Sequence, residues 1–404
     1  MSTQVLSVEK DSPTEENQDF QTQAVATIAG AHTANDTFQA FLPPLLPVLI
    51  ENLALSKTQA GLLSVFLNLP SALQPYFGQV ADRVNLRPVV ILAPAVTAVM
   101  MSLIGIANQY ALIGILLFIA GLSSAVFHSV APVIAGKLSG AKLGRGMSFW
   151  MVGGEAGRAI GPLVLVGALN QFGIINLPWL MLGGFGASTL LYYRLKDVPM
   201  NTIPAHPPMP VGKALQLMGP MLISMAGLIF TRGLLIAGTA TYLPTYMTES
   251  GASLWFAGLS LSIMQTAGVV GAMLGGTFSD KVGRRVLLVA ACLTTPIFMV
   301  LFLTTPLNVK PIFLALLGFT SLSMPAVMLA IMQENFPENR ALANGMTLLL
   351  FFITSAISTM IVGMIGDRWG LTTAFYISAG SMLLGAPLVF LLPAHARASQ
   401  ETQP

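Results

Sequence analysis

The chain has 404 residues, of which 54% are hydrophobic and only 9% are charged, and its formal net charge is +3. A soluble globular domain carries about 25% charged residues, so this composition excludes an ordinary water-soluble fold, and the small net charge argues against a nucleic-acid partner. The single cysteine, Cys292, excludes an internal disulfide and a cysteine-based metal site. We expect no metal and no cofactor.

Twelve apolar stretches follow one another along the chain, and each is long enough to cross a bilayer, which takes roughly 20 residues. We therefore predict an all-α integral membrane protein with twelve transmembrane helices. The predicted spans cover residues 24–50, 57–81, 88–108, 110–138, 146–170, 173–194, 214–247, 254–279, 286–306, 310–334, 340–366 and 371–393. Residues 1–23 are expected to form a disordered tail, residues 394–404 a second tail, and the proline-rich residues 195–213 a linker.

The spans divide into two related halves, because a loop motif that follows the second span returns roughly 200 residues later after the eighth. The first copy contains Gly78, Asp82, Arg83 and Arg87, and the second contains Gly276, Asp280, Lys281, Gly283, Arg284 and Arg285. Parallel repeats of this kind are typical of transporters whose halves move around a central binding site. We predict two six-helix bundles, residues 24–194 and 214–393.

This loop resembles the signature of the major facilitator superfamily, Gly-x-Leu-Ala-Asp-Arg-x-Gly-Arg-Lys. The second copy is nearly complete, whereas the first has Asn85 in place of the second glycine and Leu86 in place of an arginine. The resemblance implies a latch that closes the cytoplasmic side in the outward-facing state; a plain basic turn is the alternative. Glycines at the span ends would let a neighbouring helix approach closely, and the basic side chains would bridge to acidic groups or phospholipid heads.

Lysine and arginine residues concentrate in the loops on the side of the two tails. Because such loops remain in the cytoplasm, we expect both tails and both copies of the loop motif to be cytoplasmic. We place the chain in the plasma (inner) membrane, surrounded by lipid, and by analogy with the superfamily we expect a monomer.

The first span carries an unusual set of polar side chains: His32, Asn35, Asp36 and Gln39. His32 and Asp36 are four residues apart and therefore share one face of a helix. A carboxyl group near mid-membrane is far cheaper in its neutral form, so Asp36 is the first candidate for a proton carrier. The alternative is a permanent His32–Asp36 pair that braces the helix.

Two other spans of the first half also carry ionisable side chains. His128 lies toward the cytoplasmic end of the fourth span, where it could relay protons or simply hydrogen-bond to a neighbouring helix. Glu155 and Arg158 lie three residues apart in the fifth span. They either take part in transport or neutralise each other within one helix. The candidate proton-coupling residues are therefore Asp36, His32, Glu155 and His128.

The fifth span also contains a Gly-x-x-x-Gly-Pro element formed by Gly157, Gly161 and Pro162. Small residues four apart allow tight contact with another helix, and the proline adds a bend. The element resembles the antiporter motif found in drug/proton exporters, which favours export over uptake.

The seventh span carries Arg232, which keeps its charge when buried and therefore needs a carboxylate or an anionic substrate. In this superfamily the first and seventh spans face each other across the cavity, so Asp36 or Glu155 could pair with Arg232 when the site is empty. Tyr242, Pro244 and Tyr246, near the outer end of this span, are candidates for an outer gate; for the aromatic residues, anchoring at the membrane interface is the alternative. The candidate substrate-binding residues are Arg232, Arg158, Asn35, Gln39 and Gln265.

A narrower resemblance, to the fosmidomycin-resistance branch of the superfamily, rests on four motifs. They are Gly-Ala-His-Thr-Ala-Asn-Asp at 30–36, Gln74-Pro75-x-x-Gly78, Phe127-His128, and an arginine before Tyr242-Leu243-Pro244. The chain departs from the branch at Ser129, where proline is usual, and in carrying Glu155 and Arg158. The resemblance implies proton-driven export of a drug-like compound. Fosmidomycin is a phosphonate, which would suit Arg232.

The leading hypothesis is a proton-coupled antiporter that exports a small drug-like compound, anionic ones included, and so contributes to antibiotic resistance. Asp36, with Glu155, would take up a proton from outside and free Arg232 or the cavity to release substrate. The alternatives are uptake of a small organic anion by proton symport, and a non-transporting membrane receptor on the same fold. An enzyme is disfavoured, because no nucleophile–base constellation, metal-ligand spacing or phosphate-binding loop is present.

Overall fold

The computed structural model describes residues 20–81, 84–196, 211–336 and 340–392, and the regular secondary structure within them is entirely helical. The first half contains α1 (Thr22–Gln39), α2 (Leu42–Leu53), α3 (Lys57–Asn68), η2 (Leu69–Leu73), α4 (Gln74–Ala81), α5 (Arg87–Leu103), η3 (Ile104–Ile106), α6 (Tyr110–Leu138), η4 (Gly140–Lys142), α7 (Leu143–Phe172), η5 (Ile174–Leu180) and α8 (Met181–Leu195). The second contains α9 (Val211–Glu249), α10 (Leu254–Val282), α11 (Arg284–Thr304), α12 (Lys310–Leu322), α13 (Met324–Asn335), α14 (Arg340–Leu383) and α15 (Gly385–Val389).

Several expected spans are interrupted, and proline or glycine accounts for the breaks. A proline inside a helix removes one backbone hydrogen bond and clashes with the preceding turn. Accordingly, Pro43 and Pro44 open α2 after α1, Pro70 lies in the 3₁₀ turn between α3 and α4, and Pro325 follows the start of α13. The long α14 covers the last two expected spans, and Gly370 turns the chain between them with a φ of 82°.

Nine helices of the described residues are long and apolar enough to cross a membrane. One of them, Gly345–Val389, joins the last two expected spans, and the first two expected spans are not among the nine, since they are broken into shorter helices. The prediction of an all-α membrane protein is confirmed, while the number twelve stays a prediction.

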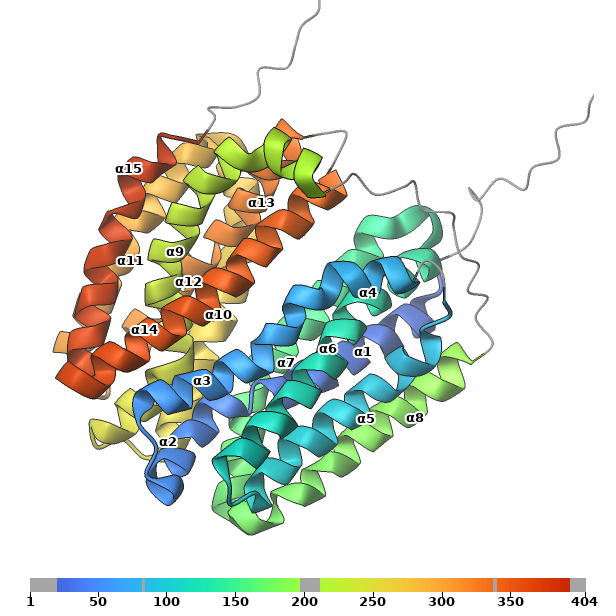
Figure 1. The fold of residues 1–404 in the computed structure, drawn as a ribbon, viewed down its shortest axis with the longest axis horizontal. Coiled ribbons are helices and arrows are strands. Elements are labelled where there is room, and N and C mark those ends of the chain that lie inside the picture. The colour runs from blue at the N-terminus through green and yellow to red at the C-terminus, as the bar shows by residue number, and fades with distance from the viewer. Residues whose placement is uncertain (1–19, 82–83, 197–210, 337–339, 393–404) are drawn as a thin grey trace, which may run out of the picture.

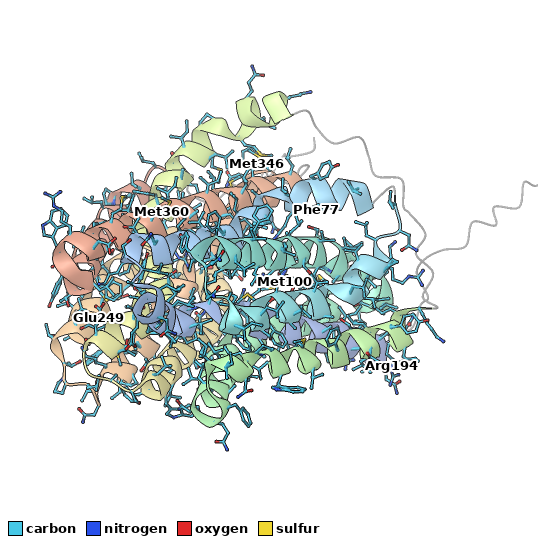
Figure 2. All side chains as sticks on the ribbon, turned by 60° about the horizontal axis from the view of Figure 1, so that its bottom comes forward. Phe77, Met100, Arg194, Glu249, Met346 and Met360 are labelled. Carbon is cyan, nitrogen blue, oxygen red and sulfur yellow. The ribbon has the colours of Figure 1, made fainter. Side chains whose placement is uncertain are left out.

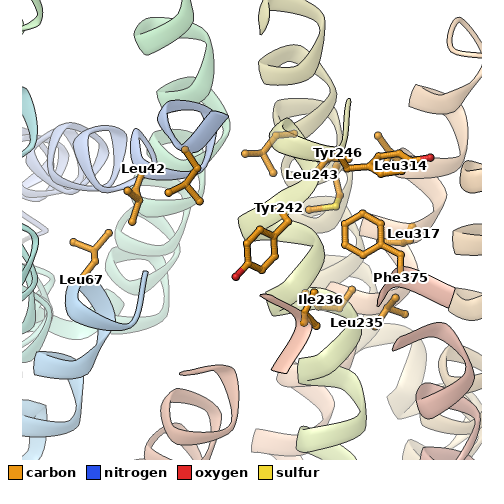
Figure 3. Close-up of a cluster of buried hydrophobic side chains, with 14 of the residues drawn as sticks. Leu42, Leu67, Leu235, Ile236, Tyr242, Leu243, Tyr246, Leu314, Leu317 and Phe375 are labelled. Carbon is orange, nitrogen blue, oxygen red and sulfur yellow. The ribbon is translucent and has the colours of Figure 1, made fainter. Parts of the chain in front are cut away.

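Figure 1 shows the helices in two groups, with α1–α8 in one and α9–α15 in the other. Between them α3 packs on α14, α2 on α9 and α7 on α10. The apolar core follows the same arrangement. In Figure 3, side chains of α9 such as Leu235 and Leu243 pack among Leu314 and Phe375, and Tyr242 projects toward the first group.

The repeat extends to individual contacts between equivalent helices. A methyl group added at Gly121 of α6 would lie 2.0 Å from the carbonyl oxygen of Leu67 in α3. One added at Gly318 of α12 would lie 2.1 Å from that of Met264 in α10. Each group thus needs a glycine where its fourth expected span crosses its second, because only glycine allows the backbones so close.

Candidate functional site

Helices α1 and α7 lie in unusually close contact, and glycines of α7 make this possible. A methyl group at Gly157 would lie 2.5 Å from the carbonyl oxygen of Thr33, and one at Gly161 would lie 2.5 Å from that of Thr37. The Thr33 hydroxyl donates a hydrogen bond to the Gly153 carbonyl across the contact, at 2.9 Å. The antiporter-like element therefore holds the polar face of α1 against α7.

The centre of the site is formed by His32 and Asp36 of α1 and His128 of α6. The two imidazole Nε2 atoms are 3.0 Å apart. The Asp36 carboxylate lies 3.5 Å from His32 Nε2 through Oδ2 and 3.3 Å from His128 Nε2 through Oδ1. The Asp36 side chain is only 2% exposed. Three groups that can each bind or release a proton thus share one buried spot.

Both rings also make polar contacts on the side away from Asp36. His32 Nδ1 is 2.8 Å from the Trp150 carbonyl oxygen, and His128 Nδ1 is 2.9 Å from that of Ser124. The Ser124 hydroxyl lies 3.0 Å from the same Nδ1 of His128, so this nitrogen either donates to the carbonyl or accepts from the hydroxyl. The two Nε2 atoms face each other across 3.0 Å, and a hydrogen on one of them can bridge the pair.

Asn35 supports this centre and is not part of the described lining of the cavity between the two groups of helices. Its amide nitrogen donates to Asp36 Oδ1 at 3.2 Å and to the Ser124 hydroxyl at 2.9 Å. Asn35 is 0% exposed, so in this conformation it orients the carboxylate and does not reach a substrate. Its proposed substrate-binding role would require a different conformation.

Arg158 connects this centre to the space between the two groups of helices. Its Nη1 lies 3.8 Å from Asp36 Oδ2, and its other terminal nitrogen pairs with Glu155. The Arg158 side chain is nevertheless 44% exposed. Glu155 and Arg158 pair within α7, as one of the two interpretations expected, and the arginine also contacts Asp36. Their part in transport stays a prediction.

A cavity of about 240 Å³ lies between the two halves and takes its lining from both. This volume is just below the roughly 300–1,000 Å³ typical of drug-sized sites, so the enclosed space suits a compact molecule. Arg158 is the one charged side chain in the described lining. Its polar residues are Gln39, Ser64, Asn68, Arg158, Thr241, Gln265, Ser355 and Thr359, and Pro162 also contributes.

Arg232 lies elsewhere. It is 8% exposed, does not line this cavity, and donates from Nε to the Ser321 carbonyl at 3.0 Å. Its guanidinium also lies 5.8 Å from the Phe351 ring centroid. Among the described carboxylates, neither Asp36 nor Glu155 pairs with it. The expected pair across the cavity is absent from this conformation. Arg232 instead binds the Ser321 carbonyl near the end of α12, where the tenth expected span breaks.

The halves are joined at the end of the molecule marked by Glu249 in Figure 2, opposite Arg194. Lys57 Nζ pairs with Glu249 at 2.9 Å, and the Tyr242 hydroxyl donates to the Lys57 carbonyl at 2.8 Å. Asp367 accepts from the Lys57 amide at 2.5 Å and from the Thr58 amide at 2.9 Å. The suggested gate position of Tyr242 thus coincides with a contact between the halves.

The second loop motif makes contacts within its own half. Arg284 pairs with Asp280 of α10 at 2.5 Å and with Glu334 of α13 at 2.8 Å. Glu334, at the end of the tenth predicted span, thus pairs with an arginine of the loop motif. Gly283 has a φ of 98°, which favours glycine between α10 and α11. In this arrangement the motif ties α10, α11 and α13 together.

One expectation for the loop motifs, the close helix approach at Gly276, needs correction. Gly276 has no neighbour within 4 Å of an added methyl group, whereas Gly275 would meet Ser323 at 2.6 Å. The close helix approach is thus made by Gly275, one position earlier, because that position faces α12 and α13.

The remaining residues of the loop motifs lie near the ends of helices or outside the described residues. Gly78 lies inside α4. Asp82 and Arg83 lie outside the described residues, and Lys281 lies at the edge of a groove between α10, α11 and α12.

Sequence reasoning missed two contributors to the buried centre. Ser124 precedes His128 by four residues and therefore shares its helical face, a signal that was available. Trp150 stacks on His32 with ring centroids 3.7 Å apart. Nothing in the sequence links residues so distant, so only the packing of α7 on α1 reveals this contact.

The fold and this buried polar centre define a membrane transporter built from two related halves. Residues 28–315 match the profile of the Major Facilitator Superfamily, and the chain belongs to this family. Family membership makes it a transporter and not an enzyme.

The chain is similar to two transport-related proteins in sequence and to solved transporter structures in fold. The fosmidomycin resistance protein of Escherichia coli (strain K12) is 25% identical over 379 residues, covering 91% of this chain and 92% of that protein. The uncharacterized MFS-type transporter YfnC of Bacillus subtilis (strain 168) is 29% identical over 383 residues and covers 90% of both chains. The crystal structure of a D-xylose–proton symporter, 16% identical, matches with a TM-score of 0.74 over 93% of this chain and 98% of that one; at this identity the likeness concerns the fold alone.

Proposed function

We propose that this chain is a proton-coupled secondary transporter that exports a small drug-like compound in exchange for protons, by alternating access. The observation that carries the proposal is the position of Arg158, which lines the cavity and contacts the Asp36 carboxylate at 3.8 Å. A compound in the cavity can therefore act on the proton site through one side chain. The similarity to a fosmidomycin resistance protein supports export, because removal of a drug explains how a transporter confers resistance.

The proton unit in this proposal is His32, His128 and Asp36. In this proposal the two imidazoles share one proton, which together with the positive charge of Arg158 balances the carboxylates of Asp36 and Glu155. Loss of the proton leaves one uncompensated negative charge in the membrane interior, which is costly. A bound cation or a strong hydrogen-bond donor would remove that cost. Proton and substrate would then replace each other, which is the requirement for exchange.

The distribution of basic loops indicates which end of the molecule faces the cytoplasm. With the tails in the cytoplasm, the end joined by Lys57, Glu249 and Asp367 faces outward. The described conformation would then be inward-facing, with the cavity reached from the cytoplasm. The chain would act in the plasma membrane among lipids and as a monomer.

A second candidate is uptake of a small organic anion together with a proton, and the same arginine favours it. Arg158 is the one charged side chain of the described cavity lining, and its guanidinium can bind an anion in a bidentate manner. An anion there would add negative charge beside the proton unit and hold the proton in place. Anionic compounds would then travel with protons, and cationic ones against them.

The test is proton movement in proteoliposomes that contain a pH-sensitive dye, with fosmidomycin and matched cationic and anionic amphiphiles added in turn. Exchange predicts that protons move opposite to the compound, and symport predicts movement in the same direction. No compound-dependent proton movement with any probe would contradict both candidates.

Variants make this test specific to the proposed link. Arg158→Gln should abolish compound-dependent proton movement, and Arg158→Lys should restore part of it, because lysine keeps the charge but loses the fork of donors. Arg368→Gln is the matched control, since Arg368 is exposed and lies beside Trp369, away from the cavity. Unchanged coupling in Arg158→Gln would disprove the role of Arg158.

A further inference from the structure

The three atoms at the centre of the site are spaced like the ligands of a tetrahedral metal ion. Zinc binds histidine nitrogen and carboxylate oxygen at about 2.0–2.2 Å, so the edges of its tetrahedron are about 3.3–3.5 Å. The corresponding separations here are 3.0 Å between the Nε2 atoms of His32 and His128, and 3.5 Å and 3.3 Å from these atoms to Asp36. One face of a tetrahedron is thus already assembled.

The surroundings of the two rings match those of metal-binding histidines. Such histidines usually donate their second ring hydrogen to a carbonyl or carboxylate, which fixes the tautomer and turns the lone pair toward the ion. His32 Nδ1 faces the Trp150 carbonyl and His128 Nδ1 faces the Ser124 carbonyl. In the tautomer with the hydrogens on Nδ1, both Nε2 atoms offer a lone pair beside Asp36.

Two imidazoles and one carboxylate select a particular class of ion. This donor set suits divalent transition metals such as Zn²⁺, Co²⁺ and Ni²⁺, whereas Mg²⁺ and Ca²⁺ require mostly oxygen ligands. We infer that His32, Asp36 and His128 form a binding site for one divalent transition-metal ion. The inference does not rest on the direction or the substrate of transport.

The neighbouring charges set the conditions for binding. Asp36 of α1 and Glu155 of α7 together offset the two charges of the ion, and Arg158 of α7 remains as an opposing charge. Arg158 contacts Asp36 and lines the cavity, so the ion would enter past this side chain, and a water would complete the four ligands. Because protons compete with metal ions for histidine and carboxylate ligands, the affinity should fall as the pH falls.

The experiment uses the full chain purified in detergent with an affinity tag that contains no histidine. Cobalt chloride is titrated while visible absorption is recorded, and zinc chloride is titrated by calorimetry at pH 8 and pH 6. We expect one ion per chain, an intense visible spectrum typical of four-coordinate Co²⁺, and weaker binding at pH 6 than at pH 8.

Histidine variants assign the site. His128→Gln and His32→Gln should each weaken binding at least about tenfold. The double variant His206→Gln/His395→Gln removes the two remaining histidines, which lie outside the described residues, and should bind normally. His128 is less buried than His32, so its variant keeps the test valid if His32→Gln does not fold.

Three results would overturn the inference. They are no saturable binding of Co²⁺ or Zn²⁺ to the unaltered chain, binding by the His32→Gln and His128→Gln variants as tight as that of the unaltered chain, and loss of binding in the double control. Since binding is measured in detergent without a gradient, the inference can fail while the proposed transport holds, and the reverse is also true.

Discussion

Arg87 and Arg285 make the same contact in the two halves of the molecule. Arg87 begins α5 and donates from Nη1 to the carbonyl of Leu195 at the end of α8, at 3.0 Å. Arg285, near the start of α11, donates from Nε to the carbonyl of Leu392 beyond α15, at 3.1 Å. Each arginine therefore ties the start of the third expected span of its half to the end of the sixth. The last arginine of each motif thus acts within one half in this conformation.

Replacing either arginine should destabilise the protein by a similar amount. Arg87→Gln and Arg285→Gln each remove charged hydrogen bonds to helix-end carbonyls, and such bonds contribute about 1.5–3 kcal/mol. Thermal unfolding in detergent measures the effect, with Arg368→Gln as the control for loss of an exposed charge. A clear loss of stability in one variant and none in the other would show that the two contacts are not equivalent.

Replacing Asp36 with asparagine should separate substrate exchange from the proton gradient. Asparagine fits the same space but cannot balance the shared proton of His32 and His128, so a proton gradient should no longer drive transport. Exchange of substrate across the membrane without a gradient should persist. Radiolabelled substrate in proteoliposomes reports both activities. Glu51→Gln, at an exposed carboxylate of α2, is the control, and normal gradient-driven transport by Asp36→Asn would refute the proton role.

The contact of Asp367 with the first half should weaken at strongly acidic pH and remain unchanged around neutral pH. Partial burial raises the pKa of Asp367, but hydrogen bonds from the Thr58 hydroxyl and from the amides of Thr58 and Lys57 lower it below its ordinary value. The ionised form therefore stabilises the joined state. This contribution is complete above the ordinary aspartate pKa of about 3.9 and is lost as the pH falls through the lowered pKa.

Distances between spin labels test this prediction. Labels at Glu51→Cys and Arg368→Cys, in a Cys292→Ala background, should report an unchanged distance between about pH 6 and 8 and a longer one at strongly acidic pH. Asp367→Asn should give longer distances at neutral pH and little further change on acidification. If Asp367→Asn leaves the distance unchanged at neutral pH, the contact does not hold the halves together.

The contact between α1 and α7 should tolerate no side chain at Gly157. In Gly157→Ala the new methyl group would lie 2.5 Å from the Thr33 carbonyl and 2.9 Å from Asp36 Cβ. Overpacking of this kind costs about 1–3 kcal/mol, and here it also displaces the carboxylate. We expect a lower unfolding temperature together with weaker proton coupling. Gly186→Ala in α8, where nothing lies within 4 Å, should be neutral or slightly stabilising.

The sequence by itself determined the class of the protein and much of its architecture. Long apolar stretches predict membrane helices because the bilayer demands them locally, and the repeated motifs at Gly78 and Gly276 reveal two related halves. The sequence also singled out His32 and Asp36, because a polar side chain inside an apolar stretch is conspicuous whatever its neighbours are.

Only the tertiary structure decided which of these side chains meet. His128 lies beside His32 across 96 residues of chain, and Arg158 reaches the cavity while Arg232 binds the Ser321 carbonyl at the break before α13. These outcomes depend on how far each helix is rotated about its axis and where it bends. Rotation and bending are set by contacts between distant helices, such as those of Gly157 with α1, and a local pattern of residues carries no record of them.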